Sequence, residues 1–432
     1  MTFDTQTSYK IPSGAHWDDV RNVPSDVGKA IVAAFRAMEK ANSEKLTGIF
    51  GDGTWTNKNR LPDRILKDLL EHFSKHTLSL ENCPEDELGQ GYEYLIKQFA
   101  DDSGHTAQEF YTNRTVVHLM TEILQPKSGE SIYDPTCGSA GMLISAIVHL
   151  QRHKKEWRNV SLYGQEINML SSAIGAHEPL FLHGIEDFEI VNGDTLANPA
   201  FTENGRLRQF DMIVANPPYS VSQWNRAAFE SDKYGRNILG VPPQSRADYA
   251  FFQHILVSMK PKTGRCAILF PHGVLFRSEE REMREKLVRS DWVDCVIGLG
   301  PNLFYNSPME ACIVICRTEK PDTHKNHVLF INALNEVTRK NAQSYLEPHH
   351  IERISKAYRA YKTEEGFAKK VSIRDIEKND FSLNIPLYVQ IKTNESVTDT
   401  RTIQECFDDW KESSEKMRKC YDKLNELLKE GV

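Results

Sequence analysis

The fold of this chain can be inferred outward from residues 210–220, which read FDMIVANPPYS. The apolar run from Met212 to Ala215 predicts a short buried strand. The strand must end near Asn216, because the two prolines that follow cannot donate to a sheet ladder and each fixes its own φ. A residue that precedes proline also favours extended geometry. The sequence therefore predicts a stiff loop beyond the carboxyl end of a strand, which is where open α/β sheets bind ligands.

The side chains of this loop suit a substrate that carries a planar NH2 group. The side-chain carbonyl of Asn216 and the backbone carbonyl of Pro217 can both accept hydrogen bonds from such a group. Pro218 keeps the loop rigid, and Tyr219 can stack on the ring that bears the amine. The alternative is a strand followed by a rigid loop without a ligand, and a glycine-rich turn upstream favours the binding site.

That turn lies between an expected strand and an expected helix. The strand covers residues 131–134, the turn reads PTCGSAG over residues 135–141, and the apolar helix covers residues 142–150. Such a unit opens many nucleotide-binding folds, and its glycines let the backbone approach a ligand closely. The spacing is neither the dinucleotide fingerprint nor a phosphate loop. Asp134 at the end of the strand indicates a ligand with a positive group and not a pyrophosphate.

Acidic residues follow three successive expected strands. The second strand, residues 161–165, ends at Glu166, and the third, residues 188–191, is followed by Asp194. An acid at the end of the second strand is the usual acceptor for a ribose hydroxyl. Each acid alone would be an ordinary solvated loop residue. Together with Asp134 they lie at one expected sheet edge, in register with the glycine-rich turn, and predict a nucleoside pocket.

A helix is expected from Thr115 to Leu124, and the residues before it, 108–114, read QEFYTNR. Thr112 and Asn113 have the chemistry of helix caps. The free N–H groups and the positive dipole at such a helix start suit a carboxylate. This signal is weak when it is taken alone.

Helices are expected on both sides of the α/β region. Residues 1–105 place apolar residues at helical spacing, including a candidate helix at residues 92–99. Residues 220–247 form a long polar loop with four basic residues, which suits either a phosphate-contacting flap or ordinary surface charge. Helices return after about residue 335.

The last helix carries a heptad seam that favours a partner helix over packing within its own domain. The seam consists of Phe407, Trp410, Ser414, Met417, Tyr421, Leu424 and Leu428.

Length and composition set the broader limits. A chain of 432 residues suits two or three domains, and its net charge of −7 argues against a nucleic-acid binder that works alone. No apolar run approaches the ~20 residues of a membrane span, and the N-terminus lacks the order of a signal peptide. Eight cysteines occur without a Cys-x-x-Cys pair, which predicts a reduced, cytoplasmic protein without a zinc site.

The combined motifs resemble the modification subunits of type I restriction–modification systems, adenine-specific DNA methyltransferases with an Asn-Pro-Pro-Phe/Tyr motif. The resemblance covers nearly the whole chain. The matching segments are residues 109–112 (EFYT), 134–141 (DPTCGSAG), 216–219 (NPPY), 271–277 (PHGVLFR) and 302–305 (NLFY). The chain departs from the family pattern at residues 107–108, at Asn113 and at Ala140, and its N-terminal domain is expected to be shortened.

The resemblance implies a Rossmann-like methyltransferase domain at residues 106–335, between an N-terminal helical domain at residues 1–105 and a C-terminal helical region at residues 336–432. It implies that S-adenosylmethionine is the methyl donor. The catalytic residues that it implies are Asn216, Pro217, Pro218 and Tyr219. The cofactor-binding residues that it implies are Glu109, Phe110, Tyr111, Thr112, Asn113, Arg114, Asp134, Gly138, Ser139, Ala140, Gly141, Glu166 and Asp194.

Within that set, Glu109, Thr112, Arg114 and residues 139–141 would hold the methionine end of the cofactor. Glu166 would take the ribose and Asp194 the adenine. The expected partners are double-stranded DNA, a specificity subunit flanked by two modification subunits, and a restriction subunit that can join them.

Two alternatives stay open at this point. Any planar NH2 group fits the same loop, so a related enzyme could act on a protein glutamine or an RNA base. The chain could also be a catalytically idle scaffold in a DNA-defence complex, although the presence of Asn216 and Glu166 argues against a scaffold.

Overall fold

The structure is a computed structural model that describes residues 10–43, 50, 54–77, 113–168, 180, 185, 187–303, 310–340, 343–390 and 403–430. The helix expected at residues 92–99 lies outside these ranges. Contacts divide the chain into two units, Met1–Gln390 and Ile391–Val432, and each is described by itself.

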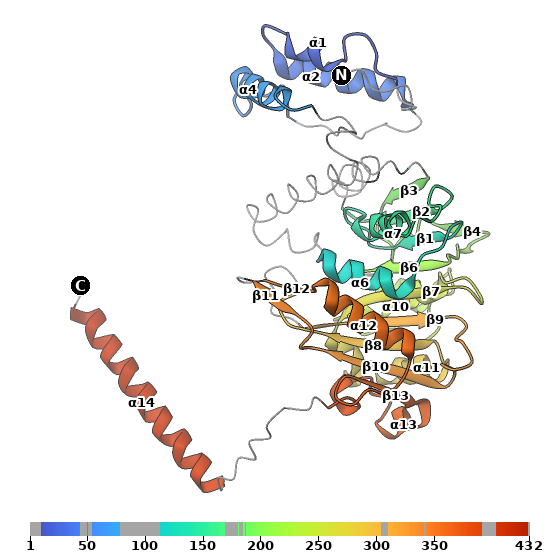
Figure 1. Cartoon of the computed structure of the whole chain (residues 1–432), viewed down its shortest axis with the longest axis vertical. Helices are drawn as coiled ribbons and strands as arrows, with labels where there is room; N and C mark the ends of the chain where they lie inside the picture. Colours follow the sequence, from blue (N-terminus) through green and yellow to red (C-terminus); the bar gives the residue numbers. More distant parts are fainter. Residues whose placement is uncertain are drawn as a thin grey trace. The chain divides into compact units, whose positions relative to one another are not determined.

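The first unit is built around a nine-stranded sheet with the order β13-β10-β8-β9-β7-β6-β1-β2-β3 (Figure 1). Its strands are β1 (Ser131–Asp134), β2 (Ser161–Glu166), β3 (Phe188–Asn192), β6 (Met212–Ala215), β7 (Arg265–Pro271), β8 (Val293–Leu299), β9 (Ala311–Arg317), β10 (His327–Ala333) and β13 (Ala368–Ser372). Strands β3, β2, β1, β6 and β7 are mutually parallel, whereas β9 runs antiparallel to both of its neighbours. The expected α/β fold is thereby confirmed.

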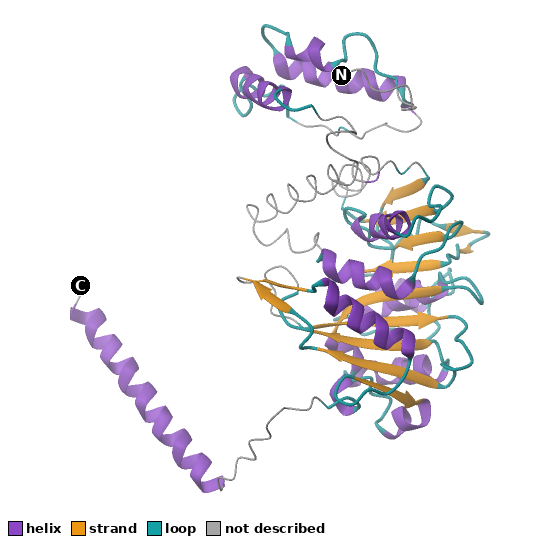
Figure 2. Cartoon of the chain, in the orientation of Figure 1, coloured by secondary structure: helices purple, strands orange, loops and turns teal. Residues whose placement is uncertain are grey.

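Helices cover both faces of the sheet (Figure 2). They are α6 (Arg114–Leu124), α7 (Gly141–Arg152), α10 (Asp248–Val257), α11 (Arg281–Arg289), α12 (Pro348–Ala360) and α13 (Ile373–Lys378). Ile132 and Met212 enter the core beneath α6, α7 and α12. Their neighbours Tyr133 and Ile213 enter the core beneath α10, α11 and α13. Both faces of β6 are therefore buried, which explains why its sequence is apolar without alternation.

Several short elements complete the sheet-bearing unit. They are β4 (Thr202–Glu203), β5 (Arg206–Leu207), β11 (Thr338–Lys340), β12 (Gln343–Tyr345), α9 (Arg226–Glu230) and the 3-10 turns η3 (His272–Leu275), η4 (Ser278–Glu280) and η5 (Ile385–Leu387). The expected domain boundary at residue 335 falls inside this unit. β13 pairs with β10, and α12 packs on α6, so residues well beyond 335 complete the sheet and its cover.

Three helices form a separate small core near the N-terminus: α1 (Trp17–Arg21), α2 (Val27–Ala41) and α4 (Asp63–Ser74). Arg21 donates two hydrogen bonds to the Glu71 carboxylate, both at 2.8 Å, and so ties α1 to α4. The Asp63 carboxylate accepts from the N–H groups of Asp26 and Val27 at the start of α2.

The second unit contains α14 (Ile403–Glu430), the long helix at the C-terminal end of the chain (Figure 1). Three seam residues are strongly exposed: Phe407 at 54%, Trp410 at 63% and Met417 at 73%. Within the described parts of the chain, no helix is long and apolar enough to cross a membrane.

Candidate functional site

The order of the strands brings the predicted site residues to one edge of the sheet. β1 lies between β2 and β6, and all three strands are parallel, so their carboxyl ends share an edge. From β1 the chain proceeds to β2 and β3 on one side, and later returns to β6 on the other (Figure 1). Such a reversal is the topological switch point at which open α/β sheets bind ligands. Asp134, Glu166 and Asp194 lie on one side of it, and Asn216 lies on the other.

The glycine-rich turn docks onto the end of β2. Gly138 and Ala140 both have left-handed backbones, with φ of 51° and 59°. The Gly138 N–H donates to Glu166 Oε2 at 2.9 Å, and the Cys137 N–H donates to the Gln165 carbonyl at 3.0 Å. The turn that follows β1 is thus held against β2, and Gly141 begins α7 from it. A left-handed φ is easiest for glycine, and Ala140 adopts it here with its methyl group buried.

Two buried carboxyl groups lie close together beneath this turn. Asp134 is 2% exposed, and its Oδ1 accepts from the Thr136 N–H at 2.9 Å. Burial, with a further contribution from the negative charge of Glu166, raises the pKa of Asp134 to about 8. Glu166 Oε1 accepts from the Asn168 N–H at 2.8 Å. A cationic ligand at this position would relieve the repulsion between the two acids, which fits a sulfonium or ammonium group.

Asp194 shapes the turn after β3. Its Oδ1 accepts from the N–H groups of Leu196 and Ala197, at 2.8 and 3.1 Å. The carboxylate is half-buried, and carboxylate oxygens can accept further hydrogen bonds beyond these two. Asp194 is therefore fixed at the sheet edge where the sequence placed it.

Asn113 has a structural role in the contacts that are described. Its Oδ1 accepts from the Thr115 N–H at 3.0 Å and so caps α6, as expected. Its side-chain amide donates to the carbonyls of Leu303 and Ser344, at 2.9 and 3.1 Å. Arg114 is the first residue of α6, at this same end. Glu109, Phe110, Tyr111 and Thr112 lie outside the described residues.

Asn216 and Tyr219 contact each other directly beyond the end of β6. The Tyr219 hydroxyl donates to Asn216 Oδ1 at 2.8 Å. Burial raises the pKa of this hydroxyl, so it stays protonated and acts as the donor. Pro217 is buried and Pro218 is exposed. The carbonyl that the sequence assigns to a substrate amine is therefore occupied by the tyrosine in this conformation.

A buried ion pair between Asp248 and Arg277 accepts a hydrogen bond from Ser220, the next residue of the loop. This pair was not predicted from the sequence. The Ser220 N–H donates to Asp248 Oδ1 at 2.7 Å, and Arg277 Nη1 donates to Asp248 Oδ2 at 2.7 Å. Ser220 has a left-handed φ of 53°. Asp248 begins α10, and Arg277 follows β7, the strand next to β6. The only local signal in the sequence is an aspartate that directly precedes the apolar run at residues 249–252.

Beside this pair lies Glu280, a buried carboxyl group without a described hydrogen bond. It is fully buried, and neither carboxylate oxygen accepts a hydrogen bond from the described residues. Arg277 Nη1 is 3.7 Å from its Oε1. Burial raises the pKa of Glu280 to about 7, although Arg277 opposes this rise. The group therefore titrates near neutral pH within the cluster that supports Ser220.

Two of the four basic residues in the loop at 220–247 are engaged in ion pairs. Arg236 is buried, pairs with Asp232 at 2.6 Å, and donates to the carbonyls of Thr195 and Leu196. Arg246 pairs with Glu279 at 2.9 Å. Arg236 thus ties this loop to the turn after β3, and its buried position does not suit contact with phosphate.

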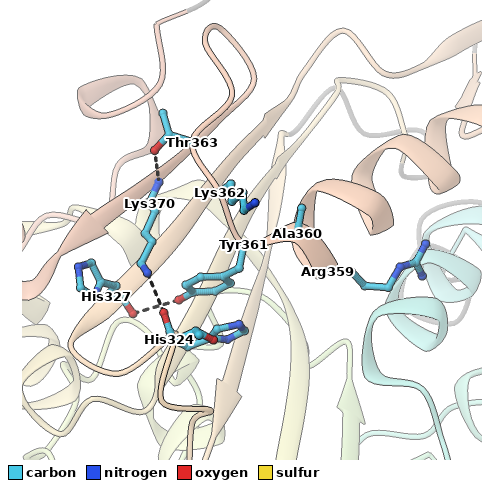
Figure 3. A pocket seen from close by; sticks show the side chains of 9 residues that line it. His324, His327, Arg359, Ala360, Tyr361, Lys362, Thr363 and Lys370 are labelled. Atoms are coloured by element: carbon cyan, nitrogen blue, oxygen red, sulfur yellow. Dashed lines mark hydrogen bonds between the residues drawn. The ribbon is translucent and has the colours of Figure 1, made fainter.

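A basic pocket of about 570 Å³ lies at the opposite edge of the sheet (Figure 3). His327 opens β10, which runs in the same direction as β6, so the pocket is at the amino ends of these strands. The His324 ring stacks on Tyr361 at 3.4 Å, and its Nδ1 lies 2.8 Å from Asp294 Oδ1. The pocket is therefore separate from the switch point. Its lining residues are Thr323, His324, His327, Arg359, Ala360, Tyr361, Lys362, Thr363 and Lys370.

Sequence comparison with known proteins identifies relatives of this chain. The N-6 DNA Methylase family matches residues 84–397. The type I restriction enzyme MjaVIII methylase subunit of Methanocaldococcus jannaschii is 33% identical over 401 residues, which cover 88% of this chain and 66% of that protein. The HindI methylase subunit of Haemophilus influenzae is 30% identical, with 88% and 89% covered.

A solved structure extends the likeness to the fold. The methyltransferase subunit of a type I restriction–modification system from Streptococcus thermophilus has a TM-score of 0.79 and 30% identity, and covers 89% of this chain. The match covers 82% of that subunit. Neither the family match nor these relatives favour a protein glutamine or an RNA base as substrate. The chain belongs to the N-6 DNA methylase family, and is an adenine-specific DNA methyltransferase that uses S-adenosylmethionine as methyl donor.

Proposed function

We propose that this chain is the methylation subunit of a type I restriction–modification complex, and that the loop at residues 216–219 presents the target adenine to the methyl donor. The observation that carries the assignment of the site is the switch point. It places the amide of Asn216 beyond β6, beside the acid-lined turn beyond β1. A base held on one side thereby faces a cofactor held on the other.

The cofactor side is formed by the turn at residues 134–141 and by the ends of β2 and β3. When bound, S-adenosylmethionine supplies an electrophilic methyl group on a positively charged sulfur. The buried carboxyl of Asp134 lies where a positive group offsets its desolvation. Glu166 keeps acceptor capacity for ribose hydroxyls beyond its two backbone contacts. Asp194 is the acceptor for the adenine of the cofactor, while residues 109–114 and 139–141 hold its methionine end.

The substrate side acts through hydrogen bonds and stacking. The target base must leave the duplex to reach this loop, and Tyr219 stacks on it there. The Asn216 and Pro217 carbonyls accept from the exocyclic amine and direct its nitrogen toward the methyl group. With S-adenosylmethionine bound, the two carbonyls would stabilise the positive charge that develops on the amine as it accepts the methyl group. The amine then loses a proton, and holding donor and acceptor in line supplies much of the rate.

The test is the substitution Asn216→Ala. We expect methylation to fall by about 100-fold or more, the typical effect of removing a preorganised transition-state partner. Binding of S-adenosylmethionine, measured by calorimetry, should remain nearly unchanged, because the lost carbonyl acts on the base. Asn379→Ala is the matched control, since that asparagine is exposed at the end of α13. An equal loss of cofactor binding in Asn216→Ala would contradict the assignment.

The partners follow from the same assignment. A chain with a net charge of −7 gains little long-range attraction to DNA. A specificity subunit would bind the DNA and read its sequence, with one methylation subunit on each side of it. A restriction subunit can join this complex. We also propose a cytoplasmic location, which the eight cysteines without a Cys-x-x-Cys pair support.

A further inference from the structure

Three potential metal ligands converge where α6 packs against α7, and a fourth lies beside one of them. α6 carries His118 and Glu122, α7 carries His149, and His153 is the C-cap residue directly after α7. Each pair is spaced four residues apart, so its members share one face of their helix. Ligand atoms of Glu122, His149 and His153 lie within 4.8 Å of one another. His118 Nε2 is 3.5 Å from Glu122 Oε1, which adds a fourth donor beside them.

The hydrogen bond of His153 leaves a donor atom suited to a metal. His153 Nδ1 lies 2.8 Å from the carbonyl of His149, so Nδ1 carries the proton and Nε2 keeps its lone pair. This pattern, a backbone carbonyl behind one ring nitrogen, is typical of metal-binding histidines.

The spacing of the ligands fits a small tetrahedral ion. Zn²⁺ binds nitrogen and oxygen at about 2.0–2.2 Å, which places neighbouring tetrahedral ligands about 3.3–3.5 Å apart. Glu122 Oε1 lies 3.1 Å from His149 Nδ1, close to that separation before any adjustment. His149 is buried with 3% of its side chain exposed, whereas His118 is 38% exposed, so the cluster has a closed inner side and an open route for entry.

We propose that Glu122, His149 and His153 bind a divalent transition metal, with Zn²⁺ as the best fit and His118 as the fourth ligand. Imidazole and carboxylate together form a donor set that zinc accepts. The prediction of no zinc site considered cysteine spacing alone, whereas the signal here is two helical pairs with spacing of four. The alternative is an ordinary hydrogen bond between Glu122 and His149 without a metal. That alternative does not explain why the other two histidines also lie beside this pair.

The role of this metal is structural. Glu122, His149 and His153 lie toward the C-terminal ends of α6 and α7, whereas the cofactor-binding residues lie at the starts of the same two helices. An ion bound at this position cross-links the two helices that carry those residues. It contacts no atom of the reacting groups, so removing it should lower thermal stability while the methylation rate at moderate temperature stays unchanged.

The test uses the full chain without a histidine tag, stripped with a chelator and dialysed into metal-free buffer. Titration with Zn²⁺ against a chromogenic indicator should show one equivalent bound per chain. Co²⁺ should give the intense visible absorption of tetrahedral coordination. His153→Gln and His118→Gln should each weaken Zn²⁺ binding by at least about tenfold. Glu122→Gln removes the anionic ligand and retains an acceptor for His149, so it should also weaken binding.

The matched control is His349→Gln on α12, because His349 is an exposed histidine outside the cluster. It should bind Zn²⁺ as the unaltered chain does. Zn²⁺ should raise the melting temperature of the unaltered chain and not that of His153→Gln. The proposal would be overturned if the chain bound no stoichiometric Zn²⁺ even at millimolar concentration. It would also be overturned if His349→Gln and His153→Gln lost Zn²⁺ binding equally. A methylation rate that falls with metal removal would overturn the structural role.

Discussion

The Tyr219 hydroxyl occupies the carbonyl of Asn216 that the proposed reaction requires. The hydroxyl takes one of the two lone pairs of that carbonyl, so it competes with the adenine amine for the acceptor. Tyr219→Phe removes the competing donor and keeps the ring that stacks on the base. We therefore expect the single-turnover methylation rate of Tyr219→Phe to equal or exceed that of the unaltered enzyme.

Tyr219→Ala should behave in the opposite way, because it removes the ring. Stacking between a base and an aromatic side chain contributes about 1–3 kcal/mol, so this variant should lose roughly tenfold or more in methylation efficiency. A Tyr219→Phe enzyme as impaired as Tyr219→Ala would show that the hydroxyl itself takes part in the reaction.

The carboxyl of Asp134 should make stability depend on pH. Its pKa is raised to about 8 in the folded chain, so the folded state retains a proton that the unfolded state releases near pH 4. Between these values its contribution to stability must fall as pH rises, by up to about 1.4 kcal/mol per pH unit. Asp134→Asn removes the titrating group. The free energy of unfolding of this variant should therefore fall less steeply with pH, by up to about 1.4 kcal/mol per pH unit.

The measurement for Asp134 is urea unfolding between pH 5 and pH 9 on both variants. The difference between them isolates this group from the other titrating residues. Identical slopes for the two proteins would mean that Asp134 is ionised in the folded chain, with its charge already stabilised. Asparagine keeps an oxygen for the Thr136 N–H, so the turn itself should survive the substitution.

At the scale of elements, Asp248 links three segments around the proposed catalytic loop at residues 216–219. It accepts from the Ser220 N–H and from Arg277, and so connects the loop after β6 with α10 and with the segment after β7. Asp248→Ala should lower turnover at least about tenfold while cofactor affinity persists, because Tyr219 loses its fixed neighbour. Stability should fall by at most about 3–5 kcal/mol, since Glu280 can take over as the partner of Arg277.

Asp248→Asn provides the finer comparison. It keeps an acceptor for Ser220 but loses the charge, so its turnover should lie above that of Asp248→Ala. Glu279→Gln is the matched control, because this carboxylate pairs with Arg246 at an exposed site in the same region. If both Asp248 variants turned over at the normal rate, the pair would serve stability alone.

The elements that the sequence predicted well are those whose pattern is local. Residues 212–215 are buried on both faces, so an unbroken apolar run marked the strand. β13 was not expected, because its sequence AKKVS pairs only at the sheet edge and carries little apolar signal. The ion pair of Asp248 and Arg277 joins residues 29 positions apart, and no local pattern indicates such a contact.

At the scale of the whole molecule, the acidic net charge and the exposed helix α14 both bear on how the enzyme binds DNA. A negative net charge gives no electrostatic steering toward a polyanion. The family fold and the switch-point site account for the chemistry but not for the choice of sequence. Weak DNA binding by the isolated chain, and site-specific methylation only with a specificity partner, is therefore the expected behaviour.

The seam of α14 is the surface that we expect to contact this partner. Phe407, Trp410 and Met417 are 54%, 63% and 73% exposed, so they are available for burial against another helix. A charge buried at the centre of such a stripe is costly. Met417→Asp combined with Leu424→Asp should therefore abolish co-purification with the specificity subunit while cofactor binding persists. Lys416→Asp with Lys419→Asp, on the polar side of the helix, should leave the complex intact. A seam variant that still assembles and methylates at the normal rate would place the docking surface elsewhere.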